Sequence, residues 1–509
     1  MAVPAAAMLA VGFWGLHRGG MWRDEAVTYQ VARRTVPQIW RLLHGVDAVH
    51  GLYYLLMHVV LAADPGHPGE VVLRLPSVCA AAVTAGLVAV LGTRLARPRV
   101  GLWAGLLYAV TPLVGHYAQE GRSYALVAAG ATGATLLFVR AVREAGRRAW
   151  WWYGAVLGVT CWLHEFAVLL LLAHAGTLAL ARSSGKVWRG WGCAAGGVAL
   201  SLLPMVVVSH GQSAQVAWLR EPDVETAQEL LRQYLGPTDG VYWTCLALGL
   251  LGLTRLVGRR GEVTLAAVAL PLAVLPPVAL MLASQLTPLY VDRYVLYALA
   301  GAPLLVALGA DRVAGLLGRL WSRAVAPVPR SAAPTLAGVL AILLAFAHQV
   351  PLLRADRLPG TRADNLGAVA AAVARALRPG DPVLFLPAHA RGAELAYPAG
   401  FTATRDVALA EPGPESGTLY GREVGAGTLR RRLAGADEVW AVVEKYAMGG
   451  YRPRLATERA KLEVLNQQFV LREETVIDRV ALRLYVRPIR VGSEESGLRV
   501  DGGRPRPRG

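Results

Sequence analysis

Long apolar runs separated by short polar segments fill the first 350 residues of the chain. A helix that crosses a membrane needs about 20 predominantly apolar residues, and about 17 is a practical lower bound. Some of the runs are short and would have to extend into their flanks. Ten runs predict spanning helices, at residues 2–16, 73–92, 100–114, 123–139, 166–181, 191–209, 241–254, 263–286, 294–310 and 335–350.

Two shorter runs decide how many times the chain crosses. Residues 51–63, GLYYLLMHVVLAA, contain His58 and fit an interfacial or re-entrant helix better than a span. Residues 150–163, WWWYGAVLGVTCWL, are also short. However, the loop before this run, residues 140–148, and the loop after the following run, residues 182–189, are both strongly basic. If both loops are cytoplasmic, the chain must cross twice and turn near His164 and Glu165. The second run therefore counts as a span.

With these assignments the loop charges separate by side. Basic loops mark the cytoplasmic face of membrane proteins, so the pattern predicts about eleven spans with a cytoplasmic N-terminus. The loop that carries WRDEAVTY, residues 22–29, then lies outside, within a long first outer loop at residues 18–72. The basic loops hold Arg94, Arg97, Arg99, Arg140, Arg143, Arg147, Arg148, Arg182, Lys186, Arg189, Arg255, Arg259, Arg260, Arg312, Arg319, Arg323 and Arg330; the opposite loops hold Glu120, Glu165, Glu221, Asp223, Glu225, Glu229, Asp239 and Asp292.

The pattern changes near Pro351, where helix-like and strand-like segments alternate. Helices are predicted at 362–377, 429–433 and 454–469, buried strands at 382–387 (PVLFLP) and 438–444 (EVWAVVE), and an edge hairpin at 476–488. We therefore expect a membrane domain at 1–350 and a small soluble α/β domain at 351–490 on the outer face. Residues 491–509 are rich in Gly, Arg and Pro and predict a disordered tail.

Composition agrees with this fold class. The chain has 509 residues, 54% of them hydrophobic and only 17% charged, as expected for a polytopic α-helical protein of the plasma membrane. The formal charge of +17 comes from clusters between apolar runs, where cytoplasmic anchoring accounts for it, so no nucleic-acid partner is expected. Residues 1–16 have no basic start and no clear cleavage site, and predict a first span rather than a removed signal.

Adjacent carboxylates at the outer end of the first span are the first candidates for chemistry. Charged side chains near membrane depth are costly, so Asp24 and Glu25 beside Trp22 and Tyr29 stand out. The alternative is that both acids are simply solvated at a membrane boundary.

The next outer turn, HYAQEGRSY, is more polar than a connector needs. It brings together Glu120, Arg122 and Tyr124, although the two charges could form no more than a local ion pair. Arg74 and Arg293 begin two further spans at the same boundary. A single arginine there can extend to lipid headgroups, whereas several around an acid-lined cavity suggest a phosphate site, because a guanidinium pairs two phosphate oxygens.

Other catalytic patterns are weak. His50, His58 and the His164–Glu165 pair could contribute to a metal site, but no HExxH spacing is present, so no metal ligand is assigned and a divalent metal is left open. The cysteines, Cys79, Cys161, Cys193 and Cys245, lack zinc or CxxC spacing. No GxGxxG, GxxxxGK[ST] or GxSxG motif stands in a suitable context, which argues against nucleotide hydrolysis and a serine triad.

The order of these motifs resembles the GT-C membrane glycosyltransferases. The acid pair after the first span, H-x-LYYLL in the first outer loop, RLPS, YAQEGRSYAL and a late DRY are similar to the glycosyltransferase family 39-like branch of protein O-mannosyltransferases and lipid A aminoarabinose transferases. The resemblance covers about residues 1–310. It implies inverting transfer of a sugar from a polyprenyl-phosphate donor to an envelope glycan, lipid or protein at the outer membrane face.

The resemblance also implies roles for the residues. Asp24 would be the general base that deprotonates the acceptor hydroxyl, and Glu25 would orient Asp24 or the acceptor. Candidates for binding the donor phosphate or substrate are Arg74, Glu120, Arg122, Tyr124, Arg293, His50 and Tyr53. Two positions depart from the family pattern: Gly51 replaces a frequent proline after the histidine, and His164–Glu165 stands where a less charged turn is expected.

Two other classes of protein compete with this interpretation. A transporter or lipid-linked-sugar flippase would also have many spans with polar helix ends, but transporters usually show repeat symmetry and polar groups at mid-membrane. Neither is evident in this sequence. A non-catalytic scaffold for envelope assembly is the third alternative.

Overall fold

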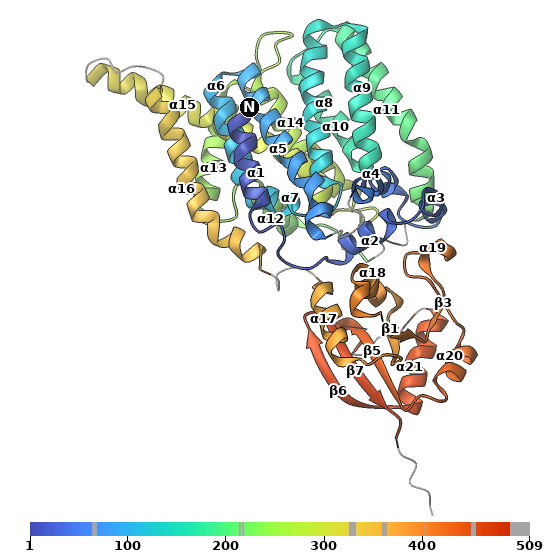
Figure 1. The fold of residues 1–509 in the computed structure, drawn as a ribbon. Coiled ribbons are helices and arrows are strands. Elements are labelled where there is room, and N and C mark those ends of the chain that lie inside the picture. Colours follow the sequence, from blue (N-terminus) through green and yellow to red (C-terminus); the bar gives the residue numbers. More distant parts are fainter. Residues whose placement is uncertain are drawn as a thin grey trace, which may run out of the picture.

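A helical bundle and a smaller sheet domain make up the computed structural model (Figure 1). It describes residues 1–63, 69–212, 215, 218–324, 332–358, 364–402, 404–448, 453 and 455–488. The predicted tail at 491–509 lies outside these residues. The helices of the bundle part are α1 (Ala2–Phe13), α2 (Arg23–Ala32), α3 (Val36–Leu43), η1 (Ala48–His50), α4 (Gly51–Ala62), α5 (Glu70–Leu95), α6 (Pro98–Val110), α7 (Pro112–Ala118), α8 (Tyr124–Glu144), α9 (Arg147–Leu163), η2 (Glu165–Leu169), α10 (Leu170–Leu180), α11 (Gly185–Gly211), α12 (Val224–Leu235), α13 (Asp239–Gly252), η4 (Leu253–Arg255), α14 (Leu265–Ala283), η5 (Asp292–Ala300), α15 (Gly301–Ala324) and α16 (Ala332–Asp356).

All eleven predicted spans are helical in the structure. Six segments of the described chain are long and apolar enough to cross a membrane: Glu70–Leu95, Tyr124–Glu144, Gly185–Gly211, Leu265–Ala283, Asp292–Leu320 and Ala333–Asp356. The other five correspond to the shorter helices α1, α6, α9, α10 and α13. The fold is thus that of a polytopic membrane protein, and the total of eleven spans stays a prediction.

Close helix packing at small residues organises one side of the bundle. α1, α5 and α6 pack together, and a side chain added at Gly101 on α6 would lie 2.2 Å from the Ala89 carbonyl oxygen on α5. Helices in membranes gain from such contacts because small residues let their backbones approach. α5 is thereby fixed against α1 and α6, and its N-terminal turn carries Arg74.

The first outer loop differs from the sequence expectation, because WRDEAVTY is not a loop. Residues from Arg23 form α2, and every residue from Glu25 to Ala32 is buried. A short helix that is buried on all sides has no polar stripe, so its sequence lacks a helical period. The segment predicted as an interfacial helix is α4, which packs against α2 and α5. The described part of the first outer loop therefore contains the packed helices α2, α3 and α4, together with the short helix η1.

The C-terminal domain contains a mixed five-stranded sheet in the order β2-β1-β5-β7-β6. β1 is parallel to β2 and β5, whereas β7 is antiparallel to β5 and β6. The predicted strands at 382–387 and 438–444 and the predicted edge hairpin are all present. The elements are α17 (Leu366–Ala376), β1 (Pro382–Leu386), η7 (Ala388–Arg391), α18 (Gly392–Ala396), η8 (Pro398–Gly400), β2 (Arg405–Asp406), β3 (Leu409–Glu411), α19 (Gly413–Ser416), β4 (Arg422–Glu423), α20 (Ala426–Leu433), β5 (Glu438–Glu444), η9 (Lys445–Ala447), α21 (Ala456–Gln468), β6 (Val470–Ile477) and β7 (Val480–Val486).

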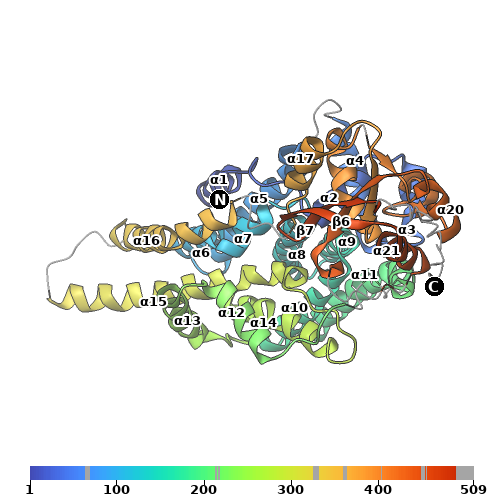
Figure 2. The ribbon, with the colours of Figure 1, turned by 90° about the horizontal axis from the view of Figure 1, so that it is seen from below.

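Successive residues of a strand point to opposite faces, and β1 shows both cores of this domain. Leu384 and Leu386 join a core beneath α20 and α21. Val383 and Phe385 join a different core that also contains residues of α17 and α18 and, across the domain boundary, of α2, α3 and α4. Seen from below, the sheet domain lies over the α2–α4 side and leaves α12, α13 and α14 uncovered (Figure 2). The sheet domain thus packs directly on the helix that carries Asp24.

Candidate functional site

The start of α2 is held from several directions. Trp22 has an extended backbone (φ −93°, ψ 172°), and the first turn that follows carries Asp24 and Glu25. Carboxylates are favoured in a first turn because the helix dipole is positive there. Just before the helix, the Met21 amide donates to the Tyr397 hydroxyl at 2.6 Å. The two acids therefore stand at a helix terminus anchored to the sheet domain.

Glu25 forms a fully buried ion pair with Arg74. The Arg74 Nε and Nη2 groups donate to the two Glu25 oxygens, each at 2.8 Å, and both side chains are 0% exposed. The Gly121 amide donates to Glu25 as well, at 2.9 Å. The remaining guanidinium N–H groups reach the carbonyl oxygens of Leu16 at 3.0 Å and Gly20 at 3.2 Å, among others. Glu25 thus joins α2, α5 and the turn between α7 and α8.

This geometry changes the expectation for Arg74. All of its N–H groups are directed at Glu25 or backbone carbonyls, and the buried side chain does not extend to lipid headgroups. These contacts describe a side chain that holds α2 against α5, whereas the contact with a donor phosphate expected from the sequence stays a prediction. Glu25, equally enclosed, orients α2 and touches no open space.

Asp24 has a different environment from its neighbour. Its side chain is 27% exposed, and an oxygen lies 3.6 Å from the Arg293 Nη2 group. The Arg293 Nε group donates to the Tyr124 hydroxyl at 3.1 Å. The guanidinium also lies over the rings of Trp22, Tyr124 and Tyr294, 5.7 to 5.8 Å from the ring centres. Arg293 is held by aromatic rings, as a cation–π arrangement requires, and faces the Asp24 carboxylate.

Arg122 and His50 form the deeper part of the site. The Arg122 Nη2 group lies 2.7 Å from His50 Nε2, and its Nη1 group donates to the Thr28 hydroxyl at 3.3 Å. Because arginine only donates, His50 Nε2 must accept and its Nδ1 atom carries the proton. Burial lowers the pKa of His50 well below 6.5, which keeps the ring neutral. The His164 ring lies 6.0 Å from His50, between centres, so we call Arg122, Arg293, His50 and His164 the arginine–histidine cluster.

Several buried donors at this cluster have no hydrogen-bond partner among the described residues. Nearly all buried polar groups in proteins are paired, so a concentration of unpaired donors indicates a site for a polar ligand. Oxygen atoms of an anion would satisfy such groups. The unpaired atoms on or beside the cluster are Trp22 Nε1, His50 Nδ1, the Tyr53 hydroxyl, Arg122 Nε, the Ser123 hydroxyl and His164 Nδ1.

Glu120 is buried beside these cations. Glu120 is 3% exposed, and its Oε2 atom has no hydrogen-bond partner among the described residues. Burial raises the pKa of Glu120 to about 7. The local ion pair with Arg122 considered from the sequence is not among the ion pairs of the described residues, since Arg122 contacts His50 and Thr28 instead.

The structure therefore gathers most of the predicted residues. Asp24, Glu120, Arg122, Tyr124, Arg293, His50 and Tyr53 belong to one region. His58 lies outside it, where its Nδ1 group donates to the Ala32 carbonyl oxygen of α2 at 2.8 Å. Glu165 points away and accepts from Ser209 at 3.0 Å. Within the described ranges, no group of three His, Cys, Asp or Glu side chains could hold a metal ion.

Sequence reasoning missed three contributors. Thr28 donates to the Asp24 carbonyl at 3.1 Å, one helical turn away, so the i, i+4 spacing was the available signal. Asp47 accepts from the Tyr54 hydroxyl at 2.7 Å, and nothing in the pattern singled it out. Tyr294, beside Arg293, packs 4.6 Å from His164 between ring centres. His164 itself was considered from the sequence only as an unusual turn residue and a weak metal-ligand candidate.

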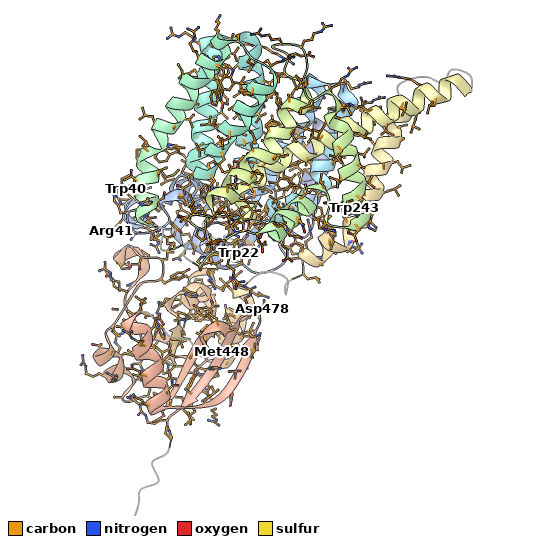
Figure 3. The ribbon with its side chains drawn as sticks, turned by 180° about the vertical axis from the view of Figure 1, so that it is seen from behind. Trp22, Trp40, Arg41, Trp243, Met448 and Asp478 are labelled. Carbon is orange, nitrogen blue, oxygen red and sulfur yellow. The ribbon has the colours of Figure 1, made fainter. Side chains whose placement is uncertain are left out.

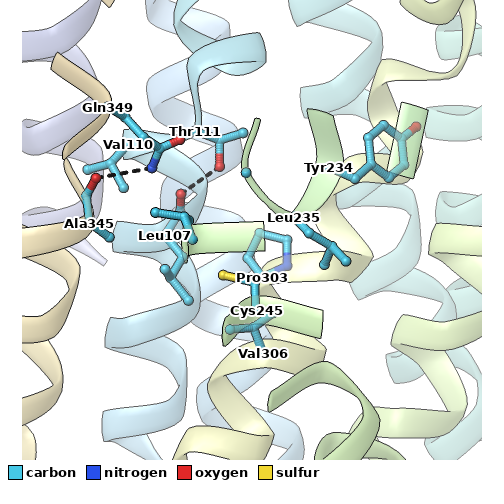
Figure 4. Close-up of a pocket in the computed structure, with 12 residues that line it drawn as sticks. Leu107, Val110, Thr111, Tyr234, Leu235, Cys245, Pro303, Val306, Ala345 and Gln349 are labelled. Atoms are coloured by element: carbon cyan, nitrogen blue, oxygen red, sulfur yellow. Dashed lines mark hydrogen bonds between the residues drawn. The ribbon is translucent and has the colours of Figure 1, made fainter. Parts of the chain in front are cut away.

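Two cavities lie elsewhere. One of about 20 Å³, enough for roughly one water molecule, is lined by Thr111, Cys245 and Gln349 and neighbouring apolar residues (Figure 4). The hydrogen bonds drawn there are within helices, from Thr111 to Leu107 and from Gln349 to Ala345. It is too small for a lipid or sugar. The other opens between α2 and the sheet domain and is considered below.

The helical bundle, the acid-bearing helix after α1 and the sheet domain define the GT-C glycosyltransferase fold. ArnT from Cupriavidus metallidurans in the apo state matches with a TM-score of 0.56 at 15% identity, over 95% of this chain and 97% of that chain. The same protein bound to undecaprenyl phosphate matches with a TM-score of 0.53 at 14% identity, over the same shares of the two chains.

A family model supports the same assignment. The model described as dolichyl-phosphate-mannose-protein mannosyltransferase matches residues 52–209. No curated protein sequence matches the chain. The resemblance to GT-C glycosyltransferases is thus confirmed in the fold, and the chain is an integral membrane protein. Its activity and the roles of its residues are matters of proposal.

Proposed function

We propose that the protein is an inverting glycosyltransferase that moves a sugar from a polyprenyl-phosphate donor to an acceptor hydroxyl at the outer membrane face. The observation that carries this proposal is the pairing of a partly exposed carboxylate with cations and unpaired buried donors. Asp24 lies 3.6 Å from Arg293, beside Arg122 and His50. A base and an anion site are the two functions that transfer from a sugar phosphate needs.

In the proposed reaction, Asp24 takes the proton of the acceptor hydroxyl while that oxygen attacks the anomeric carbon. The bond between this carbon and the phosphate oxygen breaks, and its electron pair leaves with the phosphate. One displacement from the opposite face inverts the anomeric centre. Arg293 is placed to stabilise the charge that develops on the leaving group, because it adjoins Asp24 and is 20% exposed on its side chain.

The donor phosphate is assigned to the deeper part of the arginine–histidine cluster. Arg122 Nε and His50 Nδ1 are buried donors without partners among the described residues. A phosphate accepts several hydrogen bonds at once, and arginine matches its geometry well. Tyr53 on α4 adds a buried hydroxyl nearby. The two ArnT structures named above, one apo and one bound to undecaprenyl phosphate, share the fold of this chain. This likeness supports a lipid-linked donor here.

The charge distribution along α5 supports the proposed orientation. Arg74 in its N-terminal part joins α2, and a helix of 26 residues extends about 39 Å. Past the other end, Arg97 and Arg99 pair with Asp311 at 3.0 and 2.5 Å. Basic residues favour the cytoplasmic side, so α2 and the sheet domain are assigned to the outside of the plasma membrane and the N-terminus to the cytoplasm.

A lipid-linked-sugar flippase is the second candidate, since a bundle with an anion site could also move a lipid phosphate. The partly exposed carboxylate next to Arg293 favours the enzyme, because a flippase needs no base. A divalent metal at the carboxylates is a further possibility that chelation can test. The acceptor hydroxyl in this proposal belongs to an envelope glycan, lipid or protein.

The test uses purified full-length protein and a panel of undecaprenyl-phosphate sugars, with released undecaprenyl phosphate measured by mass spectrometry. Asp24→Asn should lower turnover about 10²- to 10⁴-fold, the usual contribution of a general base. Asp223→Asn, the same change at an exposed helix cap that asparagine also fills, should keep wild-type turnover. A parallel sample with EDTA tests the metal.

Three outcomes separate the candidates. Turnover of Asp24→Asn at the wild-type rate, with an unchanged unfolding midpoint, would reject Asp24 as the base. Movement of donor between leaflets of a vesicle without loss of sugar would replace the enzyme with the flippase. Loss of turnover in EDTA that Mn²⁺ restores would add a metal to the mechanism.

A further inference from the structure

An open cleft lies where α2 meets the sheet domain. It has a volume of about 480 Å³ and is lined by Arg23, Glu444, Lys445, Tyr446 and Arg479. Arg23 immediately precedes Asp24 in the first turn of α2. The other four come from the end of β5, from η9 and from the turn between β6 and β7. Figure 3 labels Asp478 of that turn at the edge of the sheet domain facing the bundle, with Trp22 on the bundle side.

The cleft walls are held together by interactions across the domain boundary. Arg23 Nη2 donates to Glu444 at 3.1 Å, and Arg23 Nε lies 3.8 Å from Asp364. The Lys445 amide donates to the Arg479 carbonyl at 2.6 Å, which fixes η9 against the β6–β7 turn. The position of the cleft next to the candidate base is therefore built into the fold.

Its charge is positive. Glu444, whose side chain is 6% exposed, is already paired with Arg23. Lys445 and Arg479 are both exposed, and neither makes a salt bridge with any residue in the described part of the chain. Two cations without a salt bridge among the described residues therefore line the cleft.

An aromatic side chain completes the lining. Tyr446 is 52% exposed and stacks with His389, whose ring is 6.1 Å away between centres at 15°. One face of the tyrosine is therefore covered by His389, whose Nε2 atom lies 3.3 Å from the Tyr446 hydroxyl, and the residue lines the cleft. An aromatic ring combines apolar area with a polar tip, which suits contact with a sugar ring.

We propose that this cleft binds the acceptor of the transfer reaction, and that the acceptor is a saccharide that carries phosphate or carboxylate groups. The inference rests on the proposed glycosyl transfer and names its acceptor class. Lys445 and Arg479 would pair with the anionic group and Tyr446 with the ring, which directs a hydroxyl of the same or a neighbouring sugar toward Asp24.

A lipid headgroup is the competing source of negative charge. The five lining residues are four charged side chains and a tyrosine, and none of them is aliphatic. The lipid-phosphate donor is assigned to the arginine–histidine cluster, which includes buried donors, whereas the cations of the cleft are exposed. These features favour an anionic sugar over a lipid.

The test measures binding to the full-length protein in detergent by saturation-transfer NMR titration. The probes are trigalacturonic acid and mannose 6-phosphate, with neutral maltotriose and short-chain dihexanoyl phosphatidylglycerol for comparison. The variant Lys445→Ala/Arg479→Ala should bind both anionic sugars about tenfold more weakly, because two charge-assisted contacts are lost. Added NaCl should weaken wild-type binding of the anionic probes and leave maltotriose unchanged.

The matched control is Arg472→Ala, an exposed arginine on the same hairpin. It lies toward the far end of the sheet, where it pairs with Glu438 at 3.4 Å, about 20 Å along β5 from Glu444. Its binding should match the wild type. Asp24→Asn should also bind the probes normally while losing turnover, which separates this proposal from the proposed function.

Equal binding of maltotriose and the anionic sugars, or a double variant that binds like Arg472→Ala, would overturn the acceptor assignment even where turnover depends on Asp24. Preferential binding of dihexanoyl phosphatidylglycerol that needs Lys445 and Arg479 would replace the sugar with a lipid headgroup. Preference for anionic sugars that the double variant loses would support the proposal.

Discussion

The buried pair of Glu25 and Arg74 makes the sharpest energetic prediction. In Glu25→Gln the side chain keeps its shape but loses its charge. Because Arg74 donates to both carboxylate oxygens, the new amide NH₂ group faces an N–H group of Arg74 whichever way the amide is turned. Two hydrogen bonds of 2.8 Å now end at the Glu25 carboxylate, and both residues are 0% exposed. Removing one partner of a buried ion pair costs about 3–5 kcal/mol, because the other charge stays buried.

Equilibrium unfolding in mixed micelles of dodecylmaltoside and SDS, followed by tryptophan fluorescence, measures this loss. Glu225→Gln is the matched control, since Glu225 also lies in a first helical turn but is exposed. It should cost no more than about 1 kcal/mol, the range of a helix-dipole contact. The double variant Glu25→Gln/Arg74→Met should lose less than the sum of the two single variants, because the uncompensated charge is gone.

The same variant has an effect on activity. Glu25 and Asp24 share the first turn of α2, so a shift of that turn moves the proposed base. A displacement of about 1 Å can cost about 10²-fold in rate. We therefore expect Glu25→Gln to lower kcat more than it raises the KM of the donor. A loss of less than about 1 kcal/mol together with wild-type turnover would refute the assignment of Glu25 and Arg74 as the anchor of α2.

Two further predictions concern the cations and the buried acid of the site. Arg293→Gln should lower kcat about 10²-fold in the undecaprenyl-phosphate release assay with an unchanged unfolding midpoint, because one preorganised positive charge that stabilises the leaving group is lost. The control is Arg232→Gln, a change at an exposed arginine side chain of α12. Equal rates for the two variants would contradict the role of Arg293. Glu120→Gln should change the pH dependence of stability. Burial raises the pKa of Glu120 from 4.5 to about 7, so the folded state holds a proton that the unfolded state releases, and this contribution to stability falls as pH rises from 4.5 to 7. At about 1.4 kcal/mol per unit the loss is about 3 kcal/mol, and the variant should lack it. Parallel unfolding curves of wild type and variant between pH 5 and 8 would contradict the raised pKa.

Apolar length and loop charge were sufficient to predict the eleven apolar helical segments of the bundle, but not the more polar helices α2, α3 and α12. Alternation and turn residues predicted the strands: the segment EVWAVVE coincides with β5, Glu438–Glu444. These signals are local, because each depends on the solvent or lipid around a single segment. The order of the acid pair and the polar turn in the chain similarly placed Asp24, Arg122 and Arg293 in one region.

Pairing between distant residues could not be predicted in the same way. Arg74 at the outer boundary was expected to face lipid or phosphate, and its partner is 49 positions earlier in the chain. The difference between Glu25, which is enclosed, and Asp24, which is 27% exposed, depends on the rotation of α2. Since α2 is buried from residue 25 onward, its sequence has no polar face from which to derive that rotation. The cleft also escaped prediction because its walls come from both domains.

The environments of the two adjacent acids assign them different tasks. On a helix, neighbouring residues project about 100° apart, so a turn that directs Glu25 into the buried pair directs Asp24 elsewhere. Arg23, on the preceding position, reaches Glu444 of the sheet domain at 3.1 Å. One turn of α2 is thus fixed to α5 through Glu25 and to the sheet domain through Arg23, with Asp24 between them. If the proposed acceptor binding in the cleft changed how the sheet domain sits on the bundle, these contacts would also move Asp24, the proposed base.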